Sequence, residues 1–81
     1  MKIRYFAWIK DITNKDYEII NKDYPGDINE LKNIINIMYP DLKKHISEDI
    51  LRFAVNNEYT STNKKLDSTD EIAIFPPVSG G

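Results

Sequence analysis

The terminal carboxylate is the group in this sequence with the clearest chemical potential. The chain ends in Pro76-Pro77-Val78-Ser79-Gly80-Gly81, directly after the apolar run Ile72–Phe75. Two prolines remove backbone donors and favour an extended chain, so a strand must end before them. Gly80 and Gly81 lack a Cβ, which lets a carboxylate enter a site too narrow for any side chain. The ending therefore predicts an extended arm whose carboxylate reacts in the active site of another protein.

A carboxylate is a poor acyl donor, because oxide is a poor leaving group. Attack on the α-phosphate of ATP would turn the Gly81 carboxylate into an acyl adenylate. That mixed anhydride could then accept sulfur to give a thiocarboxylate, or an amine to give an amide. The catalytic groups for these steps would belong to partner proteins. The alternative is a passive tail, since chain ends are often disordered and Ser-Gly-Gly is common in linkers.

The other residues of the chain give little indication of catalysis, metal binding or phosphate binding. Cysteine is absent, which excludes a disulfide, a thiolate zinc site and a thiol nucleophile. The single histidine, His45, follows Lys43 and Lys44 and is expected to be a surface residue. The carboxylates match no metal-binding spacing, and no glycine-rich phosphate loop is present. We therefore expect no catalytic activity from the chain alone, no metal and no tightly bound cofactor.

Composition predicts a small globular protein. The 81 residues allow one domain, with 41% hydrophobic and 30% charged residues and a net charge of −2. Acidic and basic residues are interspersed without a basic stripe, which argues against nucleic acid as a partner. The longest purely apolar run, Tyr5–Ile9, is too short to span a membrane. No signal peptide is expected, and a cytoplasmic location is the simplest interpretation.

The elements that would carry the tail follow from hydrophobic periodicity. Strands are predicted at Ile3–Ile9, Tyr17–Ile20, Arg52–Asn56, Tyr59–Ser61 and Ile72–Phe75. Polar residues 11–16 would form a hairpin turn between the first two strands, and Asn56-Asn57 would form a second tight turn. Leu66 would anchor the polar loop before the last strand.

One long helix is predicted in the middle of the chain. Asp27 and Glu30 match a capping box, and apolar residues continue at helical spacing from Ile28 to Met38. Pro40 should end the helix near Tyr39, with a short helical turn in residues 41–47. The order indicates an α+β fold of the β-grasp, ubiquitin-like type. Residues 1–75 would form the domain, a mixed sheet with the helix on one face, and residues 76–81 an extended Gly-Gly tail.

One helix can cover only one face of this sheet, and the chain has more large apolar residues than that face needs. The residues expected beneath the helix are Ile3, Tyr5, Ile9, Val55, Ile72 and Ile74. Four aromatic residues are left for the open face: Phe6, Trp8, Tyr59 and Phe75. Such a cluster favours a partner-binding surface. The alternatives are that loops fold over these residues, or that the face assignment is in error, because a slip of one residue inverts the faces.

The segment from Asp70 to Gly81 resembles the C-terminal signature of the small subunits of molybdopterin synthase, the MoaD-type sulfur carriers of the ThiS/MoaD ubiquitin-like family. Tyr5-Phe6-Ala7 and Ala54-Val55-Asn56 match that family too, so the resemblance covers essentially the whole chain. One departure is Ser68-Thr69-Asp70, where the family usually carries an Asp-Gly-Asp turn.

The resemblance implies a defined cycle. An E1-like adenylating enzyme would use ATP to activate Gly81, and a persulfide donor protein would supply sulfur for the thiocarboxylate. The tail would then enter the large subunit, where the sulfur passes to a pterin precursor in molybdenum cofactor biosynthesis. Gly80, Ser79 and Val78 would give the tail access, and Phe6, Tyr59 and Phe75 match the family's docking surface. The assembly would be a heterotetramer with the large subunits at its centre.

Three alternatives remain open at this point. The first is a thiamine-type sulfur carrier, usually shorter and without the two prolines. The second is a ubiquitin-like modifier that is conjugated to lysines through Gly81. The third is an interaction module with a passive tail, which would keep its binding if Gly81 were deleted.

Overall fold

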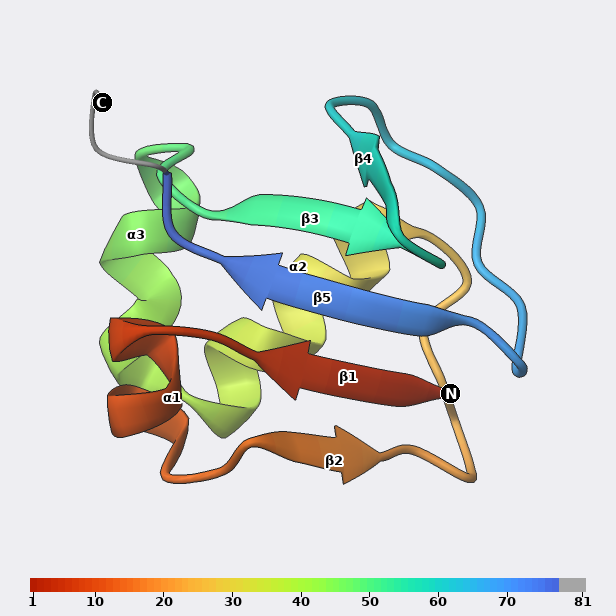
Figure 1. The fold of residues 1–81 in the computed structure, drawn as a ribbon, viewed down its shortest axis with the longest axis horizontal. Coiled ribbons are helices and arrows are strands. Elements are labelled where there is room, and N and C mark those ends of the chain that lie inside the picture. The colour runs from red at the N-terminus through yellow and green to blue at the C-terminus, as the bar shows by residue number, and fades with distance from the viewer. Residues whose placement is uncertain (78–81) are drawn as a thin grey trace.

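A computed structural model describes residues 1–77, which form a five-stranded mixed sheet with one long helix behind it (Figure 1). The strands are β1 (Lys2–Tyr5), β2 (Tyr17–Ile19), β3 (Arg52–Val55), β4 (Glu58–Thr60) and β5 (Glu71–Phe75). Their order in the sheet is β2-β1-β5-β3-β4. β5 lies parallel to β1 and antiparallel to β3, and the two outer pairs are antiparallel. This is the predicted β-grasp arrangement.

The core lies between the sheet and the helix α2 (Ile28–Met38). Alternate residues of the three central strands point into it, because successive side chains of a strand face opposite sides. Ile72 pairs with Ile3 and Val55, and Ile74 pairs with Tyr5 and Phe53, so two apolar rows cross the sheet. The buried core residues are Met1, Ile3, Tyr5, Ile9, Ile28, Leu31, Ile35, Leu42, Leu51, Phe53, Val55, Leu66, Ile72 and Ile74.

The helix α2 begins and ends where the sequence predicts. The Asp27 carboxylate accepts a hydrogen bond from the Glu30 amide at 2.8 Å. The Glu30 side chain accepts from the Gly26 amide at 2.6 Å, rather than from the Asp27 amide that a capping box would use. After Tyr39 the chain continues as a 3-10 turn, η1 (Pro40–Leu42), and a short helix, α3 (Lys43–Ser47). None of the helices in residues 1–77 combines the length and apolar character needed to cross a membrane.

The predicted first strand is too long. β1 ends at Tyr5, and the helix α1 (Trp8–Thr13) takes the place of the strand end and of much of the predicted hairpin turn. The chain reverses at Ala7, where φ is +55° and ψ is −136°, and the Ile9 amide then donates to the Phe6 carbonyl at 3.2 Å. Ile9 remains buried as expected, but it reaches the core from a helix.

The β3–β4 hairpin follows the sequence closely. Asn56 and Asn57 both have positive φ, +51° and +70°, as a two-residue hairpin turn with matching strand twist requires. Leu66 is buried and anchors the loop that leads to β5. These features confirm the predicted turn and the predicted anchor.

Candidate functional site

The root of the predicted tail lies at the end of β5, in the middle of the sheet. Phe75 is the last residue of β5 and pairs with Arg52 of β3. Pro76 is half-buried and Pro77 is exposed, so the prolines end the strand as predicted. The other tail residues singled out by the sequence, Val78, Ser79, Gly80 and Gly81, lie outside the described residues.

Three aromatic residues surround this root on the sheet face that α2 leaves open; we call Phe6, Tyr59 and Phe75 the aromatic patch. The rings of Tyr59 and Phe75 have centroids 6.3 Å apart and are inclined by 54°. The Phe6 amide donates to the Ile74 carbonyl at 3.2 Å, which places its backbone beside the end of β5. Phe6 is 40% exposed and Tyr59 is 59% exposed. The patch is therefore open to solvent next to the point where the tail begins.

Trp8, the fourth residue predicted for this face, lies elsewhere. It sits in α1, and its ring packs against His45 of α3 with centroids 4.7 Å apart. The expectation that Trp8 lies on the open face of the sheet is wrong, because the reversal at Ala7 takes the chain out of the sheet two residues after β1. His45, expected on the surface, is half-buried in this contact.

Small side chains form the centre of the open face. Ala54 of β3 pairs with Ala73 of β5, and the row continues to Tyr59 on one side and to Arg4 on the other. Glu71 lies 3.5 Å from Arg4 and 3.9 Å from Lys2, so these rim charges are paired. An apolar centre between aromatic residues and a charged rim is typical of protein-binding surfaces.

Two exposed residues of this face were missed from the sequence. Tyr17 and Ile19 of β2 are each about half exposed, and they pair with Arg4 and Lys2 of β1. The signal was present in the alternation of β2, since Glu18 between them is half-buried on the other side. They extend the open face to the far edge of the sheet.

Glu18 joins three elements on the covered side. Its carboxylate accepts hydrogen bonds from the hydroxyls of Tyr5 and Tyr39, the latter at 2.6 Å, and its other oxygen lies 3.4 Å from the Lys15 amine. Burial acts to raise the pKa of Glu18, but the hydrogen bonds from the tyrosines and the charge of Lys15 together hold that pKa below its usual value. Burial, followed by the hydrogen bond to Glu18, raises the pKa of Tyr5. The network holds β1 and β2 against the end of α2.

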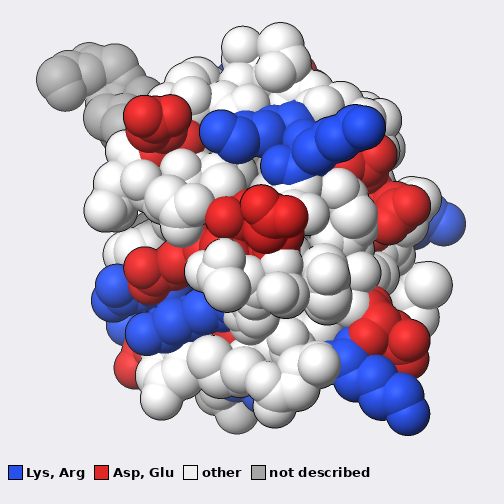
Figure 2. Space-filling model, turned by 90° about the vertical axis from the view of Figure 1, so that its right-hand side faces the viewer, with Lys and Arg blue, Asp and Glu red and all other residues white. Residues whose placement is uncertain are grey.

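Within residues 1–77, no three His, Asp or Glu side chains are grouped to hold a metal ion. On the side of the molecule in Figure 2, Lys and Arg side chains are interleaved with Asp and Glu.

Comparisons with known proteins point to one family. The model of the ThiS family matches residues 3–81. A molybdopterin synthase sulfur carrier subunit from Dictyostelium discoideum is 41% identical, with the alignment covering 99% of this chain and 94% of that protein.

Two solved structures share the fold. The first, a complex of subunits 1 and 2 of the molybdopterin-converting factor from Helicobacter pylori, contains a chain that is 27% identical with a TM-score of 0.71, over 99% of this chain and 96% of that one. The second, small archaeal modifier protein 1 from Haloferax volcanii, has a TM-score of 0.78 at 21% identity, over 99% and 97% of the two chains.

Proposed function

The chain belongs to the ThiS family, and we propose that it is the sulfur carrier subunit of a molybdopterin synthase. The observation that carries this proposal is the match over nearly its whole length to a relative of that name. The aromatic patch beside the tail root supports it, because a carrier must dock on an enzyme while its tail reaches the active site.

In the proposed cycle Gly81 is the carrier residue. An E1-like enzyme joins its carboxylate to the α-phosphate of ATP and releases pyrophosphate. The terminal sulfur of a persulfide on a donor protein displaces AMP to give an acyl disulfide. A thiol then cleaves the sulfur–sulfur bond, which leaves the thiocarboxylate on Gly81 and a disulfide on the donor side. Gly80, Ser79 and Val78 form the slender segment that allows each of these active sites to close over the tail.

The large subunit is the proposed docking partner of the carrier. Phe6, Tyr59 and Phe75 would bury their exposed surface against it while the tail delivers sulfur to the pterin precursor. The proposal includes a cytoplasmic heterotetramer with the large subunits at its centre. The chain supplies sulfur and binding surface, and the catalytic groups come from its partners.

The experiment that tests this function is intact-mass analysis of the protein isolated from cells under non-reducing conditions, with a free C-terminus. Replacement of one oxygen by sulfur adds nearly the same mass as one oxidation, and both Met1 and Met38 can oxidise. Fragmentation must therefore place the change on Gly81. We expect it there in the wild type and absent from a variant that lacks Gly81.

An unmodified Gly81, even with an activating enzyme, ATP and a sulfur donor present, would contradict the carrier function. Isopeptide-linked conjugates on lysines would then favour the modifier alternative. Transfer of the sulfur to a thiazole precursor instead of a pterin would favour the thiamine-type carrier.

A further inference from the structure

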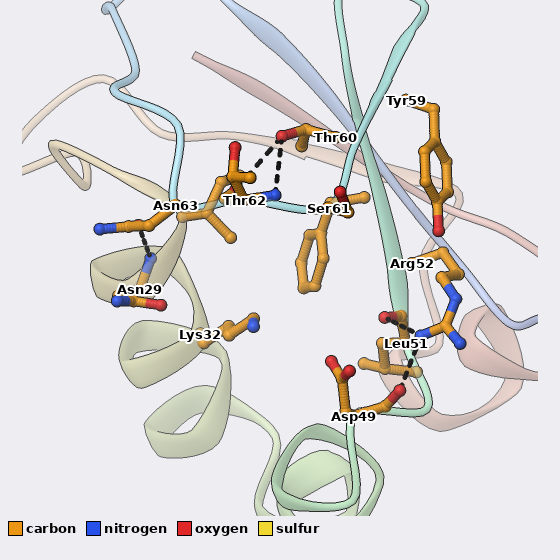
Figure 3. Close-up of a pocket in the computed structure, with 12 residues that line it drawn as sticks. Asn29, Lys32, Asp49, Leu51, Arg52, Tyr59, Thr60, Ser61, Thr62 and Asn63 are labelled. Atoms are coloured by element: carbon orange, nitrogen blue, oxygen red, sulfur yellow. Dashed lines mark hydrogen bonds between the residues drawn. The ribbon is translucent and has the colours of Figure 1, made fainter.

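Arg52 occupies a special position between the aromatic patch and the helix side of the sheet. It is the first residue of β3, pairs with Phe75 and is half-buried. Its Nη1 donates to the carbonyl oxygens of Asp49 at 2.6 Å and Leu51 at 3.3 Å. Figure 3 shows the hydroxyl end of Tyr59 directed toward the Arg52 side chain. The backbone therefore holds the charge in a fixed place beside two residues of the patch.

The charge of Arg52 has no carboxylate partner in residues 1–77. The ion pairs among these residues use Lys2, Arg4, Lys10 and Lys15. A guanidinium has five N–H donors in a planar fork, and the two carbonyls engage only Nη1. The remaining donors can bind a carboxylate in the bidentate geometry that arginine favours.

A pocket of about 360 Å³ opens at this point between α2 and the β3–β4 hairpin (Figure 3). Arg52 and Tyr59 line one side and Lys32 the other, with the Lys32 amine 5.5 Å from the centre of the Phe53 ring. Asp49 is the acidic residue of the lining. Its backbone carbonyl accepts from Arg52, but its carboxylate forms no ion pair with Arg52 or Lys32 within residues 1–77. Two cations against one carboxylate leave the lining net positive.

We propose that Arg52 is the charged anchor of the docking surface, and that it binds a carboxylate of the large subunit at the mouth of this pocket. The inference rests on the proposed function. Arginine and tyrosine are enriched among the residues that dominate binding at protein interfaces, and such residues lie within apolar surroundings that exclude water. Arg52 lines the pocket together with Tyr59 and pairs with Phe75 across the strands, so a partner seated on the aromatic patch would cover it. Its guanidinium is already held by two carbonyls and needs little ordering on binding.

A protein carboxylate fits this site better than a free multivalent anion. Asp49 in the lining would repel a second negative charge, whereas one carboxylate can be held by the fork of Arg52. The pocket is also continuous with the aromatic patch through Tyr59, so a partner seated on the patch reaches its mouth. Lys32 on the opposite wall would add a weaker, longer-range attraction.

The test compares the Kd of variants for the large subunit of the same organism, measured by calorimetry at low and at physiological salt. Arg52→Gln should weaken binding about tenfold or more and reduce the salt dependence of the Kd. Arg52→Lys keeps the charge without the fork and should give an intermediate loss. Lys22→Gln is the matched control: it removes one positive charge from an exposed loop residue that makes no ion pair within residues 1–77, and should leave binding unchanged.

A purely structural role for Arg52 predicts a different result. Loss of its bonds to Asp49 and Leu51 would lower the Tm, but binding measured where the variant is fully folded would keep the affinity and salt dependence of the wild type. That outcome, with Tyr59→Ala still weakening the complex, would overturn the inference and leave the proposed function standing. If the wild type forms no complex, the proposed function fails and the inference with it. Saturable binding of sulfate to the isolated chain, shifting the Arg52 and Lys32 resonances, would overturn the assignment to a protein carboxylate.

Discussion

Glu18 shows how one residue can join elements that are distant in sequence. Its carboxylate lies between a tyrosine of β1 and a tyrosine just after α2, and it is reached by Lys15 as well. A half-buried carboxylate is stable in such a place only when hydrogen bonds replace the water that it loses. Sequence periodicity cannot reveal this network, because its members come from three separate segments.

The network makes stability depend on pH in a defined direction. The pKa of Glu18 in the folded protein lies below its ordinary value of 4.5, so folding favours the charged form. The stabilisation is fully present above pH 4.5 and is lost as the pH falls through the lower, folded pKa. In urea unfolding, Glu18→Gln should therefore lower the free energy of unfolding at pH 7, and the gap to the wild type should narrow below pH 4.5.

The control for this prediction is Glu58→Gln, whose exposed side chain on β4 lies outside the network. It should follow the pH profile of the wild type. If the difference in free energy of unfolding between the wild type and Glu18→Gln stayed constant from pH 7 to pH 3, ionisation of Glu18 would not contribute to stability.

At the scale of elements, the start of α1 depends on one strained residue. Ala7 adopts φ +55° and ψ −136°, a region that glycine occupies readily and that other residues reach only under constraint. The turn is held by the Ile9 amide on the Phe6 carbonyl and by the burial of Ile9. Strand propensity in Ile3–Ile9 is high, but the burial of Ile9 and Thr13 against the core favours the helix.

Ala7→Gly should therefore stabilise the protein. Relief of the backbone strain should exceed the added entropy of glycine in the unfolded chain, for a net gain of about 1 kcal/mol in the free energy of unfolding. Thermal or chemical denaturation measures the gain directly.

Ala73→Gly provides the matched comparison, because Ala73 lies in the middle of β5 with ordinary strand pairing on both sides. At Ala73 the change to glycine should lower the free energy of unfolding by roughly 0.5–1 kcal/mol. Equal destabilisation at both positions would show that the turn at Ala7 carries no strain.

At the scale of the whole molecule, the sheet has one covered and one open face. α2 and the short helices after it cover the first, and the aromatic patch, the Ala54–Ala73 centre and β2 form the second. Exposed apolar residues occur on both sides of the molecule, so exposure alone does not mark a binding surface. What distinguishes the patch is its position around the root of the tail.

Tyr59→Ala and Ile37→Ala distinguish an exposed residue of the aromatic patch from an exposed apolar residue elsewhere on the surface. Ile37 is 79% exposed on α2 and Tyr59 is 59% exposed on the open face. Both changes should leave the Tm nearly unchanged, because neither side chain is part of the core. Only Tyr59→Ala should weaken binding to the large subunit, by about tenfold or more, as expected for an aromatic anchor.

Binding is measured by calorimetry on the purified subunits. Wild-type affinity in both variants would remove Tyr59 from the docking surface. Equal weakening would mean that the partner also covers α2.

The sequence by itself determined much of the architecture. The period of the α2 stripe, the Asp27 cap, Pro40, the Asn56-Asn57 turn and the prolines after Phe75 are local signals, and each acts through the backbone of its own segment. Together with the hydrophobic periodicity of the strands, they were enough to place the long helix, four of the five strands nearly to the residue and the β-grasp order. The resemblance to the sulfur carriers came from the segment Asp70 to Gly81 and two shorter matches. The proposed roles of Gly81 and the other tail residues also rest on sequence.

Only the tertiary structure decided which aromatic residues share a surface and which charges are left unpaired. A reversal of the chain at Ala7 moved Trp8 from the sheet to a contact with His45, although the local pattern favoured a strand. Pairing of β5 with β3 brought Phe75 to Arg52, and the hairpin brought Tyr59 beside them. These juxtapositions depend on strand register between distant segments, which composition and periodicity along one segment do not specify.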